Sequence, residues 1–267
     1  MPEVSNSGPT SKTEYFSGLA LSSMDSMRLL RDKGLLRQFK DERDIWRNVT
    51  EHALVQHAAC VALGEKLGLS KESLKRLSDA AVLHDGDKLY QSQGLKAINS
   101  RIESKKIDNE QGGKEKYYFF EESEAHSVKW MKDVGISDEV IKIASSDGHP
   151  AIPRIMSPNS TFEERMFHYI GSIVDGGDVV SLDQRIDNLE QNFKYKEMNE
   201  YGRSVKWTDG RTLYETQRAV GHQIELEIVK KLCKTNIDDL AKKRLEKSPN
   251  DLPIIIKEWV EANYTKK

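Results

Sequence analysis

Hydrophobic residues recur every three or four positions along most of this chain, which is the spacing that places side chains on one face of an α-helix. The segment 212–233 is a clear example, with Val220, Ile224 and Ile228 on a single stripe. No segment alternates between hydrophobic and polar residues over more than a few positions. The pattern predicts an all-α fold, with helices over 15–39, 44–67, 70–84, 121–134, 138–146, 162–174, 182–193, 212–233, 237–245 and 254–264.

Local signals mark where several of these helices begin and end. Ser70 and Ser137 are expected N-caps, because a serine side chain accepts a hydrogen bond from a free backbone N–H of the first helical turn. Gly68 is expected to end the helix before Ser70. The charged stretch 99–118 indicates a solvated loop or an inserted excursion, and the polar stretch 195–212 indicates a loop.

The chain divides into three unequal parts. Residues 1–13 are rich in Ser, Thr, Pro and Gly and offer little to bury, so we expect a disordered leader there. Residues 14–235 are expected to form one helical domain, and 236–267 a helical tail that packs on its core.

Composition narrows the classes of protein. Lys and Arg together number 41 and Asp and Glu 43, a balance that argues against a general nucleic-acid binder. Cys60 and Cys233 are far apart and form no CxxC pair, so we expect reduced thiols. The N-terminus lacks the layout of a signal peptide, and no hydrophobic run reaches the roughly 18 residues that a membrane span needs. We therefore expect a cytoplasmic protein with no membrane partner; its oligomeric state stays open.

The strongest chemical signal is His84 followed directly by Asp85, at the end of the hydrophobic run AAVL. Burying two ionisable groups is costly unless something compensates them. A divalent cation does so, because it accepts a neutral imidazole nitrogen and a carboxylate oxygen together. The alternative is a helix-end histidine beside a capping aspartate.

Three further histidines lie near the expected ends of helices. His52 is in the segment VTEH, His126 opens one later helix, and His149 follows the end of the next. Side chains at the ends of packed helices can converge on one cavity. His57, His168 and His222 are expected to have structural roles in the packing of their helices.

The segments VTEH, LGLS and AAVLHDGDK, read together, resemble the HD-domain superfamily of metal-dependent phosphohydrolases. The resemblance implies an HD-type helical bundle and an enzyme that hydrolyses a small phosphorylated molecule, a nucleotide being one candidate. It implies that His52, His84 and Asp85 hold a first ion, and that His126 and His149 join Asp85 around a second.

The same resemblance bears on the remaining site residues. Lys88 matches the family lysine that contacts phosphate, although Asp87 replaces the usual glycine before it. The family's last ligand, an aspartate, falls on Gly171, and Asp175 four residues later is the candidate replacement. Arg185 either contacts phosphate or pairs with a neighbouring aspartate, Asp183 or Asp187. Asp85 and Lys88 are thus the expected catalytic residues.

Other functions stay open on the sequence alone. The five matched ligands also suit the di-iron oxygenases that share the HD fold, whereas Gly171 suits a binding or regulatory module that has lost its chemistry. The chain contains neither GxxxxGK[ST] nor GxGxxG, so no motif indicates an NTPase or a dinucleotide enzyme. The expected cofactor is one or two ions of Fe, Mn, Co, Ni or Zn.

Overall fold

The computed structural model describes residues 26, 39–40, 46–47, 49–86, 88–191, 196–207 and 209–264. The expected leader at 1–13 and nearly all of the expected helix at 15–39 lie outside the described residues, as does Asp87. Within the described part of the chain, no helix is long and apolar enough to cross a membrane.

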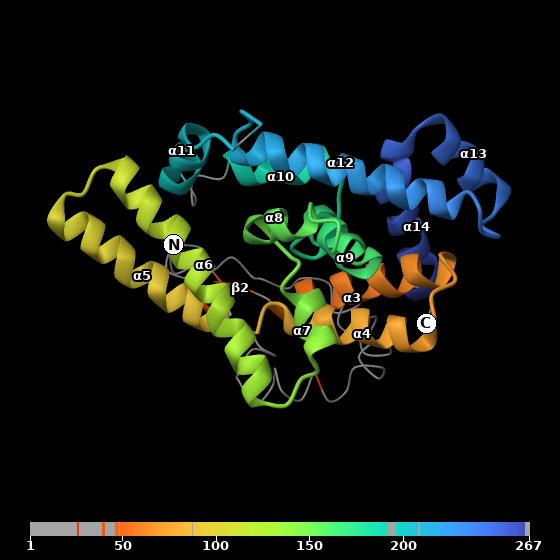
Figure 1. The fold of residues 1–267 in the computed structure, drawn as a ribbon, viewed down its shortest axis with the longest axis horizontal. Helices are drawn as coiled ribbons and strands as arrows, with labels where there is room; N and C mark the ends of the chain where they lie inside the picture. The colour runs from red at the N-terminus through yellow and green to blue at the C-terminus, as the bar shows by residue number, and fades with distance from the viewer. Residues whose placement is uncertain are drawn as a thin grey trace, which may run out of the picture.

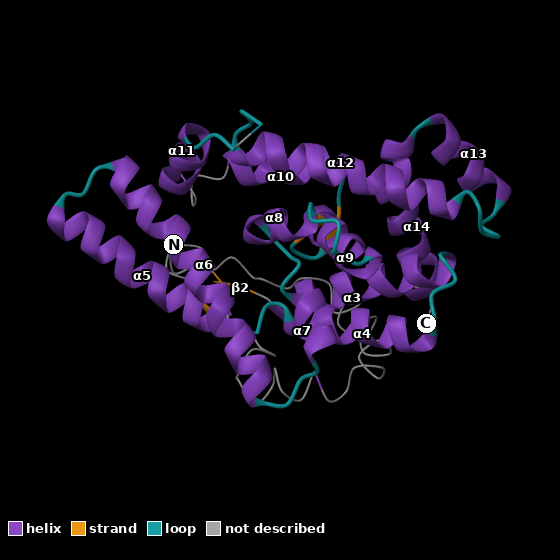
Figure 2. Cartoon of the chain, viewed as in Figure 1, coloured by secondary structure: helices purple, strands orange, loops and turns teal. Residues whose placement is uncertain are grey.

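The prediction of an all-α fold is confirmed, as Figures 1 and 2 show. Strands occur in the described residues only as two-residue segments, β1 (Phe39–Lys40) with β2 (Trp46–Arg47) and β3 (Val174–Asp175) with β4 (Asp178–Val179), each pair antiparallel. The α-helices are α3 (Val49–Lys66), α4 (Lys71–Leu83), α5 (Lys88–Lys105), α6 (Asn109–Asp133), α7 (Asp138–Ala144), α8 (Ile152–Ile155), α9 (Phe162–Ile173), α10 (Leu182–Gln191), α11 (Lys196–Ser204), α12 (Leu213–Leu232), α13 (Asp239–Lys247) and α14 (Leu252–Tyr264). Short 3-10 turns at His149–Ala151 and Pro249–Asp251 precede α8 and α14.

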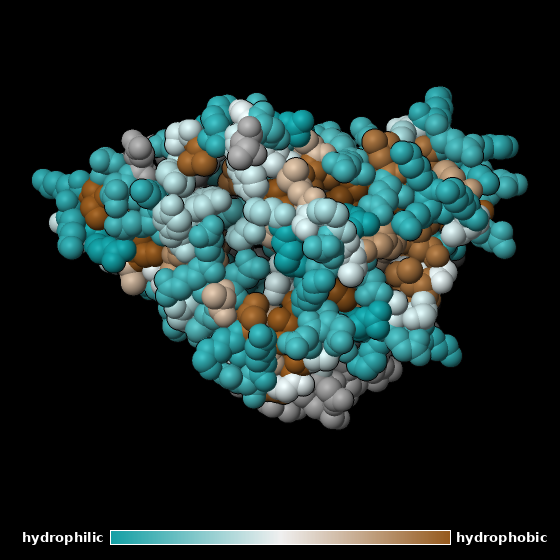
Figure 3. Space-filling model, viewed as in Figure 1, coloured by the Kyte–Doolittle hydropathy of each residue, from teal (hydrophilic) through white to brown (hydrophobic). Residues whose placement is uncertain are grey.

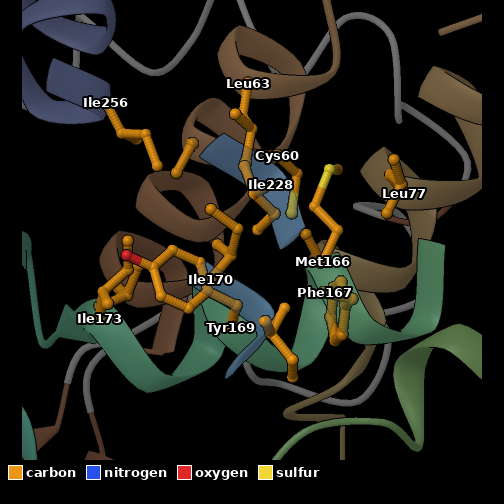
Figure 4. Packing of buried hydrophobic residues seen from close by; sticks show 14 of the residues in the cluster. Cys60, Leu63, Leu77, Met166, Phe167, Tyr169, Ile170, Ile173, Ile228 and Ile256 are labelled. Carbon is orange, nitrogen blue, oxygen red and sulfur yellow. The ribbon is translucent and has the colours of Figure 1, made fainter. Parts of the chain in front are cut away.

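Helix α9 lies at the centre of the hydrophobic core. It packs against α3, α4, α7, α10 and α12, so its buried side chains meet every neighbouring helix. Figure 4 shows Met166 and Ile170 of α9 near Cys60 of α3 and Ile228 of α12. The Tyr169 hydroxyl, also buried, donates a 2.6 Å hydrogen bond to Glu225 Oε1 of α12. On the surface seen in Figure 3, by contrast, hydrophilic residues predominate.

The expected caps are present and set the helix boundaries. The Ser70 side chain accepts a hydrogen bond from Ser73 N at the start of α4, and the Ser137 side chain does the same for Val140 N in α7. A capping box at Thr161 begins α9. Gly68 has a φ of +70°, the left-handed conformation in which glycine commonly follows a helix.

The prediction of a loop over 99–118 is wrong, because α5 and α6 form a helical hairpin there (Figure 1). Glycines allow the two helices to approach closely. A Cβ at Gly94 would lie 2.0 Å from the Phe119 ring, and one at Gly112 would lie 2.9 Å from Ile102 Cδ1. The stretch 195–212 also contains a helix, α11, which packs against α6.

The C-terminal segment contributes to the same core. Helix α14 packs on α3, and its side chains Ile255, Ile256 and Trp259 are buried there while Ile254 remains exposed. The adjoining α13 adds the buried Leu245.

We predict that Phe167→Ala destabilises the protein by about 3–5 kcal/mol, because its ring is fully buried in α9 and the substitution leaves a cavity. Leu240→Ala on α13, where the side chain is 70% exposed, is the control and should change stability by less than about 0.5 kcal/mol. Urea unfolding followed by circular dichroism measures both; equal effects would contradict the assignment of the core.

Candidate functional site

A cavity of about 260 Å³ opens where several of the helices meet. Its walls come from α3, α4, α5 and α6 on one side and from α9, α10 and α12 on the other, with the loop 145–150 between them. Such a concave pocket with converging polar groups is the ordinary form of a small-molecule site.

His52, His84 and Asp85 lie together on the wall of this cavity. One ligand atom from each lies within 4.8 Å of the other two, and this is the one group of metal-ligating side chains so arranged among the described residues. Asp85 Oδ2 is 3.9 Å from His52 Nε2, and Asp85 Oδ1 is 3.6 Å from His84 Nε2. The three residues could therefore hold a metal ion.

Backbone carbonyls fix the orientation of both imidazole rings. His52 Nδ1 donates to Gly176 O at 3.2 Å, and His84 Nδ1 donates to Ala81 O at 2.8 Å. Because a carbonyl oxygen only accepts, each Nδ1 carries the proton and each Nε2 presents a lone pair. His84 Nε2 is buried and has no hydrogen-bond partner among the described residues. This orientation of an imidazole by a second group is typical of metal-binding histidines, so the residues fit a cation.

The electrostatics favour the ligand forms of these side chains. Burial lowers the pKa of His52 to about 4, so its imidazole is neutral at pH 7. Burial by itself would raise the pKa of the Asp85 carboxyl, but Lys88, His84 and His52 hold that pKa well below its usual range. A neutral imidazole and an ionised carboxylate are the states in which these groups bind metals.

Asp147, which the sequence did not single out, approaches the same cluster. Its Oδ2 lies 3.7 Å from His84 Nε2, while its Oδ1 accepts a hydrogen bond from Gly148 N at 2.9 Å. A Cβ at Gly171 would lie only 2.0 Å from Asp147 Oδ1. The missing side chain at Gly171 thus leaves the space that the Asp147 carboxylate fills.

The structure does not bring Asp175 to this cluster. Helix α9 was expected to continue to 174, but it ends at Ile173, and Asp175 lies in β3 before a turn in which Gly176 has a φ of +60°. The Asp175 carboxylate accepts hydrogen bonds from Arg185 Nη1 at 2.6 Å and from Asn188 Nδ2 at 2.9 Å. The substitution expected from a shared helix face therefore does not occur.

Arg185 thus pairs with Asp175 rather than with either neighbour that the sequence suggested. Asp183 and Asp187 both accept hydrogen bonds from Arg218 instead. Arg185 nevertheless lines the cavity.

The two other histidines of the expected ligand set are separated. His126 is exposed on α6, and its ring stacks on that of Tyr90 with centroids 4.0 Å apart. The residues of α6 that line the cavity are instead Ser123, Glu124 and Ser127. His149 does line the cavity, and burial lowers its pKa to about 4.

Lys88 and Glu124 add two charged groups to the cavity wall. Lys88 Nζ lies 2.9 Å from Asp85 Oδ1, at the first position of α5. Burial raises the pKa of Glu124 to about 7, and the nearby carboxylates of Asp147 and Glu121 act in the same direction against the cation of Arg154. No sequence signal marks Glu124, since it is one of many acidic residues on α6.

Of the histidines expected to be structural, His168 supports the site from behind. Its buried Nδ1 donates to Ser146 O at 2.7 Å, which anchors the residue before Asp147. His57 is buried beside Ser78, and His222 bonds Glu225 and Asp183 between α12 and α10. None of these three lines the cavity.

Comparison of the chain with models of known protein families, with curated proteins and with solved structures finds no match. The resemblance to the HD-domain superfamily rests on the motif residues and remains a hypothesis.

Proposed function

We propose that this chain is a metal-dependent hydrolase of phosphoric esters, which acts on a small phosphorylated molecule through a metal-activated water. The observation that carries the proposal is the grouping of His52, His84 and Asp85 within 4.8 Å on the wall of a cavity. The resemblance of these same residues to the H…HD motif of the HD-domain superfamily supports it.

In this proposal His52, His84 and Asp85 hold one divalent ion, and Asp147 takes the place of the family's last aspartate. Imidazole and carboxylate ligands together suit Fe, Mn, Co, Ni or Zn. A bound ion of this kind lowers the pKa of a coordinated water and polarises a phosphoryl oxygen. We propose one ion and hydrolysis, rather than the two ions of an oxygenase, because His126 stacks on Tyr90 outside the cavity.

Lys88 and Glu124 have complementary roles in the proposed reaction. The Lys88 ammonium, beside Asp85, binds a phosphoryl oxygen of the substrate. Glu124, with a pKa of about 7, holds a proton that it gives to the ester oxygen as the P–O bond breaks. The alcohol then leaves neutral, and the oxygen of the attacking water stays on the phosphate.

We expect the full chain, supplied with Mn²⁺, Co²⁺ or Zn²⁺, to release p-nitrophenol from p-nitrophenyl phosphate or its diester, and a chelator to stop the reaction. His84→Ala should lower kcat/KM at least about 100-fold, because it removes a ligand of the ion. His126→Ala is the matched control and should retain activity, since His126 lies outside the cavity. An active His84→Ala variant, or no turnover with any of these ions, would sink the proposal.

A second pair of variants tests which aspartate completes the site. Asp147→Asn should weaken Mn²⁺ binding about tenfold or more, because its carboxylate faces His84. Asp175→Asn should leave that affinity nearly unchanged, because Arg185 and Asn188 hold the Asp175 carboxylate. Calorimetric titration of the chelator-treated protein measures both affinities. The reverse order of effects would restore Asp175 as the ligand.

A further inference from the structure

The wall of the cavity formed by α10 and α12 has polar groups that the proposed chemistry does not use. Arg185 and Gln217 line it, beside the hydrophobic side chains of Ile186, Leu189 and Leu213. Arg185 Nε and Gln217 Oε1 are both buried and have no hydrogen-bond partner among the described residues. An unpartnered buried polar atom is costly, so such atoms in a cavity indicate where a ligand or water binds.

The chemistry of these two atoms defines what they recognise. The Arg185 cation already pairs with Asp175 through Nη1, so its Nε–H offers a donor whose charge is largely compensated. Gln217 Oε1 is an acceptor. A hydroxyl group can bind either atom, because its oxygen accepts from a donor and its proton goes to an acceptor.

The two helices that carry this pair are held together by ion pairs. Arg218, next to Gln217, binds Asp183 and Asp187, which lie on either side of Arg185 along α10. These ion pairs link α10 to α12 at this wall, and a wall that is ordered before binding loses less entropy when a ligand binds.

Other parts of the cavity wall also carry buried polar atoms without a hydrogen-bond partner among the described residues. Ser127 Oγ, Ser145 Oγ and His149 Nε2 are also buried without a partner among the described residues, and all three residues line the cavity. The volume, about 260 Å³, lies just below the range usual for sites of drug-sized ligands. Scattered hydrogen-bonding groups in a small cavity suit a compact molecule with several hydroxyls better than a large planar base.

We propose that the substrate is the monophosphate of a small sugar or polyol, and that Arg185 and Gln217 determine specificity by binding its hydroxyl groups. This inference rests on the proposed function, since it places the phosphate near Lys88 and the metal ligands. It narrows the substrate from any small phosphorylated molecule to one with several hydroxyl groups. Binding of these hydroxyl groups does not require the metal ion.

Binding to the full chain in the presence of a chelator tests this inference apart from hydrolysis. Calorimetry should show D-ribose 5-phosphate binding at least about tenfold tighter than ethyl phosphate, which lacks the hydroxyls. Gln217→Met should lower the affinity for ribose 5-phosphate about tenfold and leave that for ethyl phosphate within about twofold. Gln223→Met, at an exposed position of the same helix, is the matched control and should bind like the wild type.

Arg185→Lys keeps a cation opposite Asp175 but removes the Nε–H donor. It should therefore also lower the affinity for ribose 5-phosphate and leave that for ethyl phosphate nearly unchanged. This variant tests the inference even if Gln217→Met does not fold. Equal affinities for the two esters, no saturable binding of ribose 5-phosphate, or discrimination retained in both variants would overturn the inference. A tenfold or greater preference for adenosine 5′-monophosphate over ribose 5-phosphate would also overturn it, in favour of a nucleotide site. Discrimination in binding without metal-dependent turnover would contradict the proposed hydrolase alone.

Discussion

Two hydrogen bonds from imidazole Nδ1 atoms to backbone carbonyls determine which way the candidate site faces. The bond from His84 to Ala81 O is local to the last turn of α4, whereas the bond from His52 to Gly176 O joins α3 to the turn between β3 and β4. Together they direct both Nε2 lone pairs toward Asp85. Without them each ring could present either nitrogen, and the three ligand atoms would not form one group.

The packing of the hydrophobic core helps to hold His84 and Asp147 in place. Phe167 of α9 meets the His84 ring edge-on, with centroids 6.0 Å apart, so the central helix supports this candidate ligand directly. One turn later in α9, Gly171 leaves room for the Asp147 carboxylate. In the proposed site, the Asp147 carboxylate from the loop 145–150 would serve as the ligand that the family resemblance expects at Gly171.

The sequence predicted the parts of this structure that depend on local signals. Serine caps and hydrophobic periodicity placed α4 and α7, and the His84–Asp85 pair at the end of a hydrophobic run marked the centre of the site. The α5–α6 hairpin could not be predicted, because its sequence is highly charged. The hairpin depends on contacts between residues far apart in the chain, such as Gly94 with Phe119, which no local pattern indicates. The family resemblance indicated His126 as a ligand, but its position on α6 leaves that side chain exposed, stacked on Tyr90.

Asp147 shows a different limit of the sequence. Its position depends on the absence of a side chain at Gly171, 24 residues later in the chain. No sequence motif links these two residues. Asp175 is the carboxylate nearest to Gly171 along the chain. It does not reach the cluster, because α9 ends before it and because Arg185 and Asn188 bind its carboxylate.

The number of divalent ions bound per chain decides whether His52, His84 and Asp85 form a metal site. Chelator-treated full-length protein would be titrated with Mn²⁺ and the bound ion counted by elemental analysis after removal of the excess. We expect one ion per chain in the wild type and none in His84→Ala. No bound ion in the wild type would contradict the metal site, and two would contradict the separation of His126 from the cavity.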